Sequence, residues 1–125
     1  MKLEKVIGIY NALSTLGNRD GLPFDAAYAV AENLDMLETP VQVYQKKRRE
    51  LIVKHAEKNA EGEIVENGDE VKIMNPVVFS DELRKLLDED VPITFDNLST
   101  IRKESLSGTG ITVAEIRGIL ELIKD

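Results

Sequence analysis

Apolar side chains recur every three or four residues over most of the first half of the chain, the spacing that gathers them on one face of an α-helix. The first group consists of Leu3, Val6, Ile7, Tyr10, Leu13 and Leu16, and it stops at Gly17. The second begins after Pro23, which suits a first helical turn, and consists of Phe24, Ala27, Tyr28, Ala31, Leu34 and Leu37. These patterns predict a helical hairpin around a loop at residues 17–21.

The second helical pattern continues beyond Pro40 with Val41, Tyr44, Arg48, Leu51, Ile52 and His55. A proline inside a helix removes one hydrogen bond and crowds the preceding turn, so we predict a kink or a break at Pro40. A rod over residues 23–59 would be roughly 55 Å long at 1.5 Å per residue. We expect it to fold back or to pack on something else, such as a second copy. The apolar stripe of residues 41–59 therefore predicts a homo-oligomer.

A hairpin and two further helices follow. Asn67-Gly68 between short β-forming runs predicts a tight turn, and the alternation of Val91, Ile93 and Phe95 predicts an edge strand that extends the hairpin to three strands. Pro76 and Ser80 compete as the start of a short helix that ends at residues 88–90. The last helix has a capping box at Thr112 and Glu115. Its predicted buried stripe is Val113, Ile116, Ile119, Leu120 and Ile123.

The predicted fold is therefore a single α+β domain over residues 1–125, predominantly helical. It combines a helical hairpin with a long kinked helix, a small antiparallel sheet and a capped C-terminal helix. The hydrophobic fraction of 42% in 125 residues suits one compact core.

Composition excludes several kinds of chemistry. The absence of cysteine excludes disulfides, thiolate nucleophiles and cysteine zinc sites, and a single histidine leaves few nitrogen ligands for metals. No nucleophile and base pair can be named, so we expect a protein that is not an enzyme and has no metal or cofactor. The net charge of −7 opposes general binding to nucleic acid or anionic membrane. No apolar run reaches the ~20 residues of a membrane span, and we expect a cytoplasmic location.

Charge is unevenly distributed along the chain. Residues 41–60 carry six basic and two acidic residues, whereas residues 61–90 carry three basic and ten acidic residues. Lys47, Arg48 and Lys54 form the candidate site for an anionic ligand, with Tyr44 one turn upstream to stack on a base. The alternative is a solvated helix face that the neighbouring acidic segment balances.

Three weaker signals have structural explanations as well. The loop at residues 107–110 could hold an anion with backbone donors, but it lacks the spacing of a phosphate-binding loop. The acidic groups around residues 61–70 and 88–90 could bind a hard cation or keep a hairpin solvated. His55 has no histidine partner, so we expect a structural or exposed helix residue.

The order of features resembles a family of small phage and prophage proteins known as domain of unknown function 1617. The likeness rests on Leu22-Pro23, residues 28–34, Tyr44 with Arg48, residues 51–58, the acidic hairpin and the capped last helix. His55 stands where that pattern has tyrosine, and Gly-Thr-Gly at 108–110 is extra. The resemblance implies a phage gene product with no assigned enzymatic activity, and it supplies no site residues.

We therefore expect a non-enzymatic phage-type binding protein located in the bacterial host. Its first predicted role is to counter host defence by capturing an anionic signalling nucleotide or a host protein. The alternative is a virion assembly accessory, a tail or capsid chaperone that acts by protein–protein contact.

Overall fold

The computed structural model of the chain describes residues 1–68 and 70–125. Its elements in chain order are α1 (Leu3–Gly17), α2 (Phe24–His55), β1 (Glu66–Asn67), β2 (Glu70–Val71), α3 (Pro76–Leu87), the 3-10 helix η1 (Phe95–Asn97), β3 (Ile101–Arg102), η2 (Lys103–Leu106), α4 (Val113–Gly118), η3 (Leu120–Leu122) and β4 (Ile123–Lys124). The predicted α+β class, predominantly helical, is confirmed.

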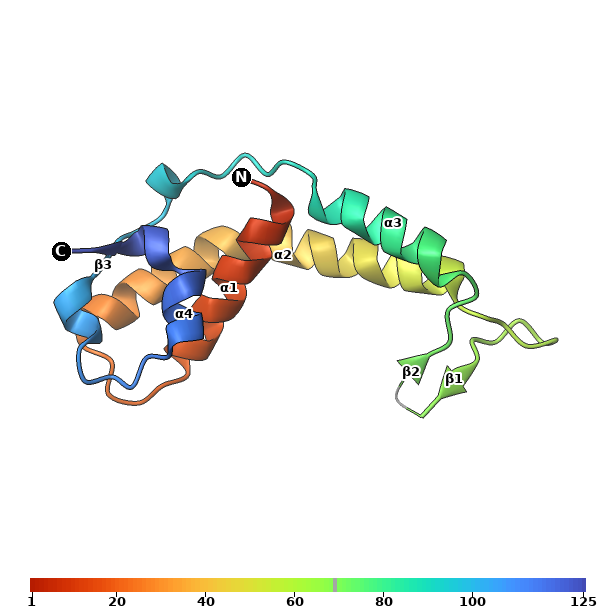
Figure 1. The fold of residues 1–125 in the computed structure, drawn as a ribbon, viewed down its shortest axis with the longest axis horizontal. Helices are drawn as coiled ribbons and strands as arrows, with labels where there is room; N and C mark the ends of the chain where they lie inside the picture. The colour runs from red at the N-terminus through yellow and green to blue at the C-terminus, as the bar shows by residue number, and fades with distance from the viewer. Residues whose placement is uncertain (69) are drawn as a thin grey trace.

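The molecule has two regions joined by α2 (Figure 1). We call α1, residues 24–41 and residues 93–124 the body, in which α1 crosses the first half of α2 and α4 lies beside α1. We call residues 42–90 the arm, in which α3 runs back along the second half of α2 and the β1–β2 hairpin lies at the far end. The deepest core belongs to the body and includes Val6, Leu13, Leu16, Leu37, Ile119 and Leu122.

Helix α2 is a single helix across Pro40, so the chain neither breaks nor folds back there. Instead α3 covers the second half of α2, where Tyr44 and Leu51 pack with Leu83 and Leu86 against the core. The apolar stripe of residues 41–59 is thus covered within the same chain. This stripe therefore no longer requires a second copy to cover it, because α3 returns along it, and the homo-oligomer stays a prediction.

The buried face of α2 differs from the predicted one. Phe24 and Tyr28 are 82% and 57% exposed, and their rings lie against each other with centroids 5.9 Å apart. The face against α1 carries mainly small residues: Ala26, Ala29, Val30 and Asn33, followed by Leu37 and Val41. Both stripes have helical spacing, and the smaller side chains allow α1 to approach more closely. A similarly close approach occurs at Gly118, where a Cβ would lie 2.6 Å from the Cβ of Ala12.

The hairpin forms, with a register one residue away from the predicted turn. Glu66 pairs with Val71 and Asn67 pairs with Glu70, so the two connecting residues are Gly68, with φ +70°, and Asp69, which lies outside the described residues. A third segment, the one that follows α2, also pairs with the hairpin region. Ala56 forms an isolated β-bridge with Ile73, and Lys58 forms one with Ile64.

The predicted edge strand at residues 91–95 was wrong. The carbonyls of Val91 and Ile93 accept hydrogen bonds from the amino group of Met1, both at 2.9 Å, and Phe95 begins η1. Backbone groups in this segment therefore pair with the start of the chain rather than with the hairpin, because α3 places the segment beside α1.

The last helix starts as predicted and ends early. Thr112 caps α4 with the predicted capping box, but α4 spans only six residues and leads through η3 into β4. Strand β4 pairs in parallel with β3, Ile101 opposite Ile123 and Arg102 opposite Lys124. Ile119 is buried, while Val113 and Leu120 are 66% and 59% exposed, which corrects the predicted stripe. Within the described residues, none of the helices has the length and apolar content needed to cross a membrane.

Candidate functional site

An apolar cleft opens at the end of the body where the chain's last elements meet. Its volume is about 730 Å³. One wall comes from η2 and the turn after it, and the other from α4, η3 and β4. Five branched apolar side chains line it: Leu106, Ile111, Ile116, Leu120 and Ile123. A cleft of this size and lining matches the clefts that accommodate apolar groups of a ligand or partner.

Charged residues stand at the rim of the cleft and nearly balance one another. They are Arg102, Lys103, Glu104 and Asp125. Arg102 forms an ion pair with Glu104, and both side chains are well exposed. An exposed pair of this kind contributes little energy, and the rim carries as many acidic as basic side chains.

Helix η2 is fixed to the start of α2 by one side-chain hydrogen bond. The hydroxyl of Ser105 donates to Asp25 Oδ2 at 2.6 Å, and this bond lowers the pKa of Asp25 below its usual range. Ser105 is buried, so the contact holds the wall that carries Leu106 in one position relative to the body.

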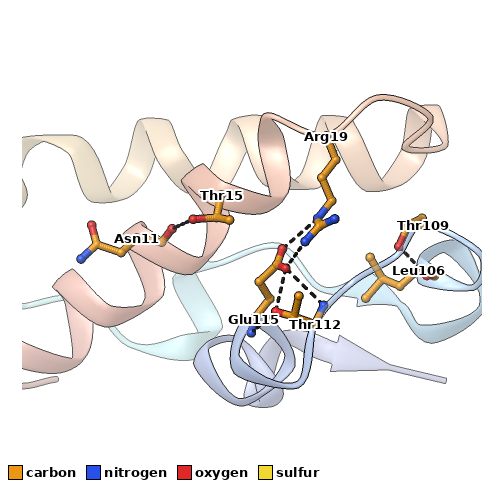
Figure 2. A network of polar contacts seen from close by, with 7 residues as sticks. All are labelled: Asn11, Thr15, Arg19, Leu106, Thr109, Thr112 and Glu115. Carbon is orange, nitrogen blue, oxygen red and sulfur yellow. Dashed lines mark hydrogen bonds and ion pairs between the residues drawn. The ribbon is translucent and has the colours of Figure 1, made fainter.

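The opposite wall is fixed by the polar network around Glu115, which Figure 2 shows in close view. Arg19, from the loop between α1 and α2, donates to both carboxylate oxygens of Glu115, with Nε to Oε2 at 3.1 Å. The Thr112 hydroxyl donates to Oε1 at 2.8 Å, and the amide of Glu115 donates to that hydroxyl at 3.2 Å. The carboxylate therefore caps α4 and ties it to the loop between α1 and α2 at the same time.

The Arg19 hydrogen bonds lower the pKa of Glu115 to about 2, with a smaller contribution from Thr112 and against the opposing effect of burial. Glu115 is thus ionised at neutral pH. The next residue, Ile116, lines the cleft, whereas Glu115 does not. The network around Glu115 therefore holds the α4 wall of the cleft in place without being part of its surface.

The turn at residues 107–110 joins the two walls. The Thr109 hydroxyl donates to the carbonyl of Leu106 at 2.6 Å and closes the turn on itself (Figure 2).

The predicted anion site lies elsewhere, in the arm. Lys47 and Lys54 line a shallow groove between α2 and α3, with Nζ to carboxylate distances of 3.4 Å to Glu89 and 3.1 Å to Glu82. The acidic segment therefore neutralises these lysines directly, as the alternative interpretation of the charge pattern expected. Two of the predicted ligand-binding residues are already paired.

The other two predicted residues do not join them in the groove. Arg48 is exposed and is not part of the groove lining, and Tyr44 is half-buried against the core. Tyr44 thus serves packing between α2 and α3. The structure brings together Lys47 and Lys54 and leaves Arg48 and Tyr44 apart.

His55 has a structural environment, one of the two that we expected. Its Nε2 lies 2.8 Å from Glu82 Oε2, and its ring meets Phe79 edge-on at 6.0 Å between centroids. Hydrogen bonds from His55 and Lys54 lower the pKa of Glu82. Among residues 1–68 and 70–125, the structure brings no three His, Cys, Asp or Glu side chains together in a way that could hold a metal ion.

Sequence reasoning missed the apolar cleft. Leu120 had a local explanation in the predicted buried stripe of the last helix, and only the pairing of β3 with β4 brings it to one surface with Leu106 and Ile111. The usable signal was the set of apolar residues on both sides of the 107–110 turn.

Comparison of the chain with protein-family models, with curated proteins and with solved structures finds no match. The resemblance to small phage proteins stays a prediction, and the case for a function rests on the geometry of the cleft.

Proposed function

We propose that this chain is a non-enzymatic, phage-type binding protein that recognises an apolar segment of a partner protein in the cleft between η2 and α4. The observation that carries the proposal is the exposed Leu120 beside the Ile116 and Ile123 side chains, an apolar surface with a balanced rim. Burial of such exposed apolar side chains against apolar side chains of a partner contributes favourable free energy to binding.

A partner protein fits this cleft better than an anionic small molecule. Arg102 is shared with Glu104, and the rim carries as many acidic as basic residues, so no net positive charge attracts phosphate. The partner would be a host protein in an anti-defence role or a phage structural protein in an assembly role.

The experiment selects displayed random peptides on the immobilised full chain and then compares two variants of the cleft region. Leu120→Glu places a charge in the cleft, whereas Val113→Glu places the same charge on an equally exposed residue outside the cleft lining. We expect the selected peptides to share apolar side chains and to lose at least about tenfold in affinity for Leu120→Glu only. Peptides that bind both variants equally would contradict the proposal.

Capture of an anionic nucleotide by Lys47, Arg48 and Lys54 is the second candidate. It requires Lys47 and Lys54 to exchange Glu89 and Glu82 for the ligand. Titration with a fluorescent nucleotide tests it: binding that falls with added salt and is lost in Arg48→Glu/Lys54→Glu would support it.

A further inference from the structure

The outer face of α2 is an extended uncovered surface on the opposite side of the helix from the core. Helices α1 and α3 pack on one side of α2, along a line that runs through Leu37, Val41 and Leu51, and β3 and η2 contact the first half of the helix beside it. The other side stays exposed over all 32 residues, roughly 48 Å at 1.5 Å per residue.

Large apolar side chains occur along the length of this outer face. Phe24 and Tyr28 form the ring pair at its beginning, Met36 and Val43 are each 47% exposed near its middle, and Val53 is exposed near its end. Exposed apolar residues on one face of a helix are typical of surfaces that another helix covers.

The charges on the outer face change sign at the middle of the helix. Asp35 and Glu32, whose carboxylate accepts a hydrogen bond from the Ser99 hydroxyl at 3.4 Å, precede Pro40, and Lys46 and Arg49 follow it. Glu50 is the one acidic residue on this face in the second half. A face with opposite charges at its two ends complements itself when one copy is reversed relative to the other.

We propose that the outer face of α2 pairs antiparallel with the same face of a second copy of this chain, about a two-fold axis near the midpoint between Pro40 and Val41. Asp35 and Lys46 each lie 5.5 residues from that midpoint, roughly 8 Å along the helix, so each Asp35 meets Lys46 of the other copy. A parallel pair would instead place Asp35 beside Asp35 and repel.

The apolar residues follow the same symmetry. Met36 and Val43 lie on one edge of the face, 4.5 and 2.5 residues from the midpoint, so across the two-fold they are offset by roughly 3 Å along the helix. Tyr28 and Val53 are each roughly 19 Å from the midpoint and pair at the two ends. The Asp35–Lys46 and Tyr28–Val53 contacts therefore agree on one register, in which Glu32 and Glu50, 8.5 and 9.5 residues from the midpoint on one edge, also approach each other.

Charge reversal with rescue tests this arrangement by sedimentation velocity on the full chain. We expect the wild type to sediment at twice the 14.0 kDa of one chain, and Asp35→Lys or Lys46→Asp alone to weaken association about tenfold. The double variant Asp35→Lys/Lys46→Asp restores association, because the reversed charges meet across the two-fold. Asp81→Lys, with the same charge change on α3, is the matched control.

Three outcomes of that experiment overturn the proposal. They are a wild type that stays at 14.0 kDa, single reversals that associate like the control, and a double variant that fails to recover. Far-UV circular dichroism of each variant confirms that it is folded.

A disulfide gives a second and independent readout, because the chain contains no cysteine. Thr39 lies on the outer face close to the midpoint, and the two-fold brings its two copies within disulfide reach. We expect Thr39→Cys to oxidise to a covalent dimer, while Asp96→Cys on η1 does so at least about tenfold more slowly. Equal rates would place the dimer contact elsewhere. Leu120→Glu leaves both readouts unchanged, which separates this surface from the cleft.

Discussion

The body and the arm are stabilised in different ways although α2 runs through both. In the body, side chains from α1, α2 and η3 surround one another, and Leu13, Leu16 and Leu37 have no exposed surface. In the arm two helices meet along a single line, and the buried core residues there are Ala56 and Leu86. Ion pairs between α2 and α3 flank that line.

This difference teaches that helix length and helix stability are separate properties. The second half of α2 extends the helix without adding a second core, so it depends on α3 for cover and on exposed charges for alignment. We expect the arm to open more often than the body, since regions with few buried apolar contacts have low local unfolding free energies. The cleft lies in the body and is therefore part of the stable region.

The largest expected effect is loss of a fully buried side chain in the body. Leu37→Ala leaves a cavity under α1 and lowers the free energy of unfolding by about 3 kcal/mol. Leu86→Ala in the arm costs about half as much, because the open groove beside it can close partly over the space. Urea denaturation followed by circular dichroism measures both. Equal losses would show that the arm is packed as tightly as the body.

The next effect concerns the anchor of the cleft wall in the body. Glu115→Ala leaves Arg19 without its carboxylate and α4 without its cap, and we expect a loss of roughly 2 kcal/mol in the free energy of unfolding. Glu115→Gln keeps the side-chain shape and serves as the milder comparison.

The same residue predicts a pH dependence. The pKa of Glu115 is about 2 in the folded chain, below its ordinary value of 4.5, so its contribution is present above the ordinary pKa and is lost as the pH falls toward 2. The midpoint temperature of thermal unfolding should therefore fall less steeply between pH 5 and pH 2 for Glu115→Gln than for the wild type. Identical slopes would mean that the Arg19 contact contributes nothing to folding.

A smaller effect belongs to the far end of the arm. Gly68 has φ +70°, which a β-branched side chain tolerates poorly, so Gly68→Val destabilises the hairpin by about 1 kcal/mol. Hydrogen exchange should become faster in residues 56–73 and stay unchanged in α1. A matching change in α1 would mean that the hairpin and the body unfold together.

The smallest effect is expected at the exposed charges of the arm. Lys54→Ala removes the ion pair with Glu82. The pKa of Glu82 is lowered mainly by the hydrogen bond with His55 and next by the bond with Lys54. The Lys54 side chain is 62% exposed, so exchange of α3 amides should accelerate less than about threefold. High salt should produce the same small change in the wild type. A larger change would make charge, and not packing, the main stabiliser of the arm.

The sequence allowed the helix positions to be predicted but not their partners. Helix α1 has the predicted bounds, α3 starts at Pro76 behind an Asn75 cap, and Thr112 caps α4. Each of these depends on residues within one turn of each other. The buried face of α2 was predicted wrongly because Phe24 and Ala26 belong to stripes of equal periodicity, and only the position of α1 decides between them.

The same distinction between sequence and tertiary structure applies to the candidate sites. The charge imbalance between residues 41–60 and 61–90 was visible in the sequence, and the structure turns it into the Lys47–Glu89 and Lys54–Glu82 pairs. The apolar cleft was not visible, because its walls come from segments on either side of a turn and meet only through the β3–β4 pairing.

Sequence alone therefore determined the class of the fold, the starts of α1, α2 and α4 and the presence of the hairpin, since propensity, capping and turn chemistry act between near neighbours in the chain. Tertiary structure decided which face of α2 is buried, that α3 covers its second half and that Arg19 reaches Glu115. Those outcomes depend on packing between segments far apart in sequence, where several arrangements satisfy the same local pattern and the burial of the whole core selects one.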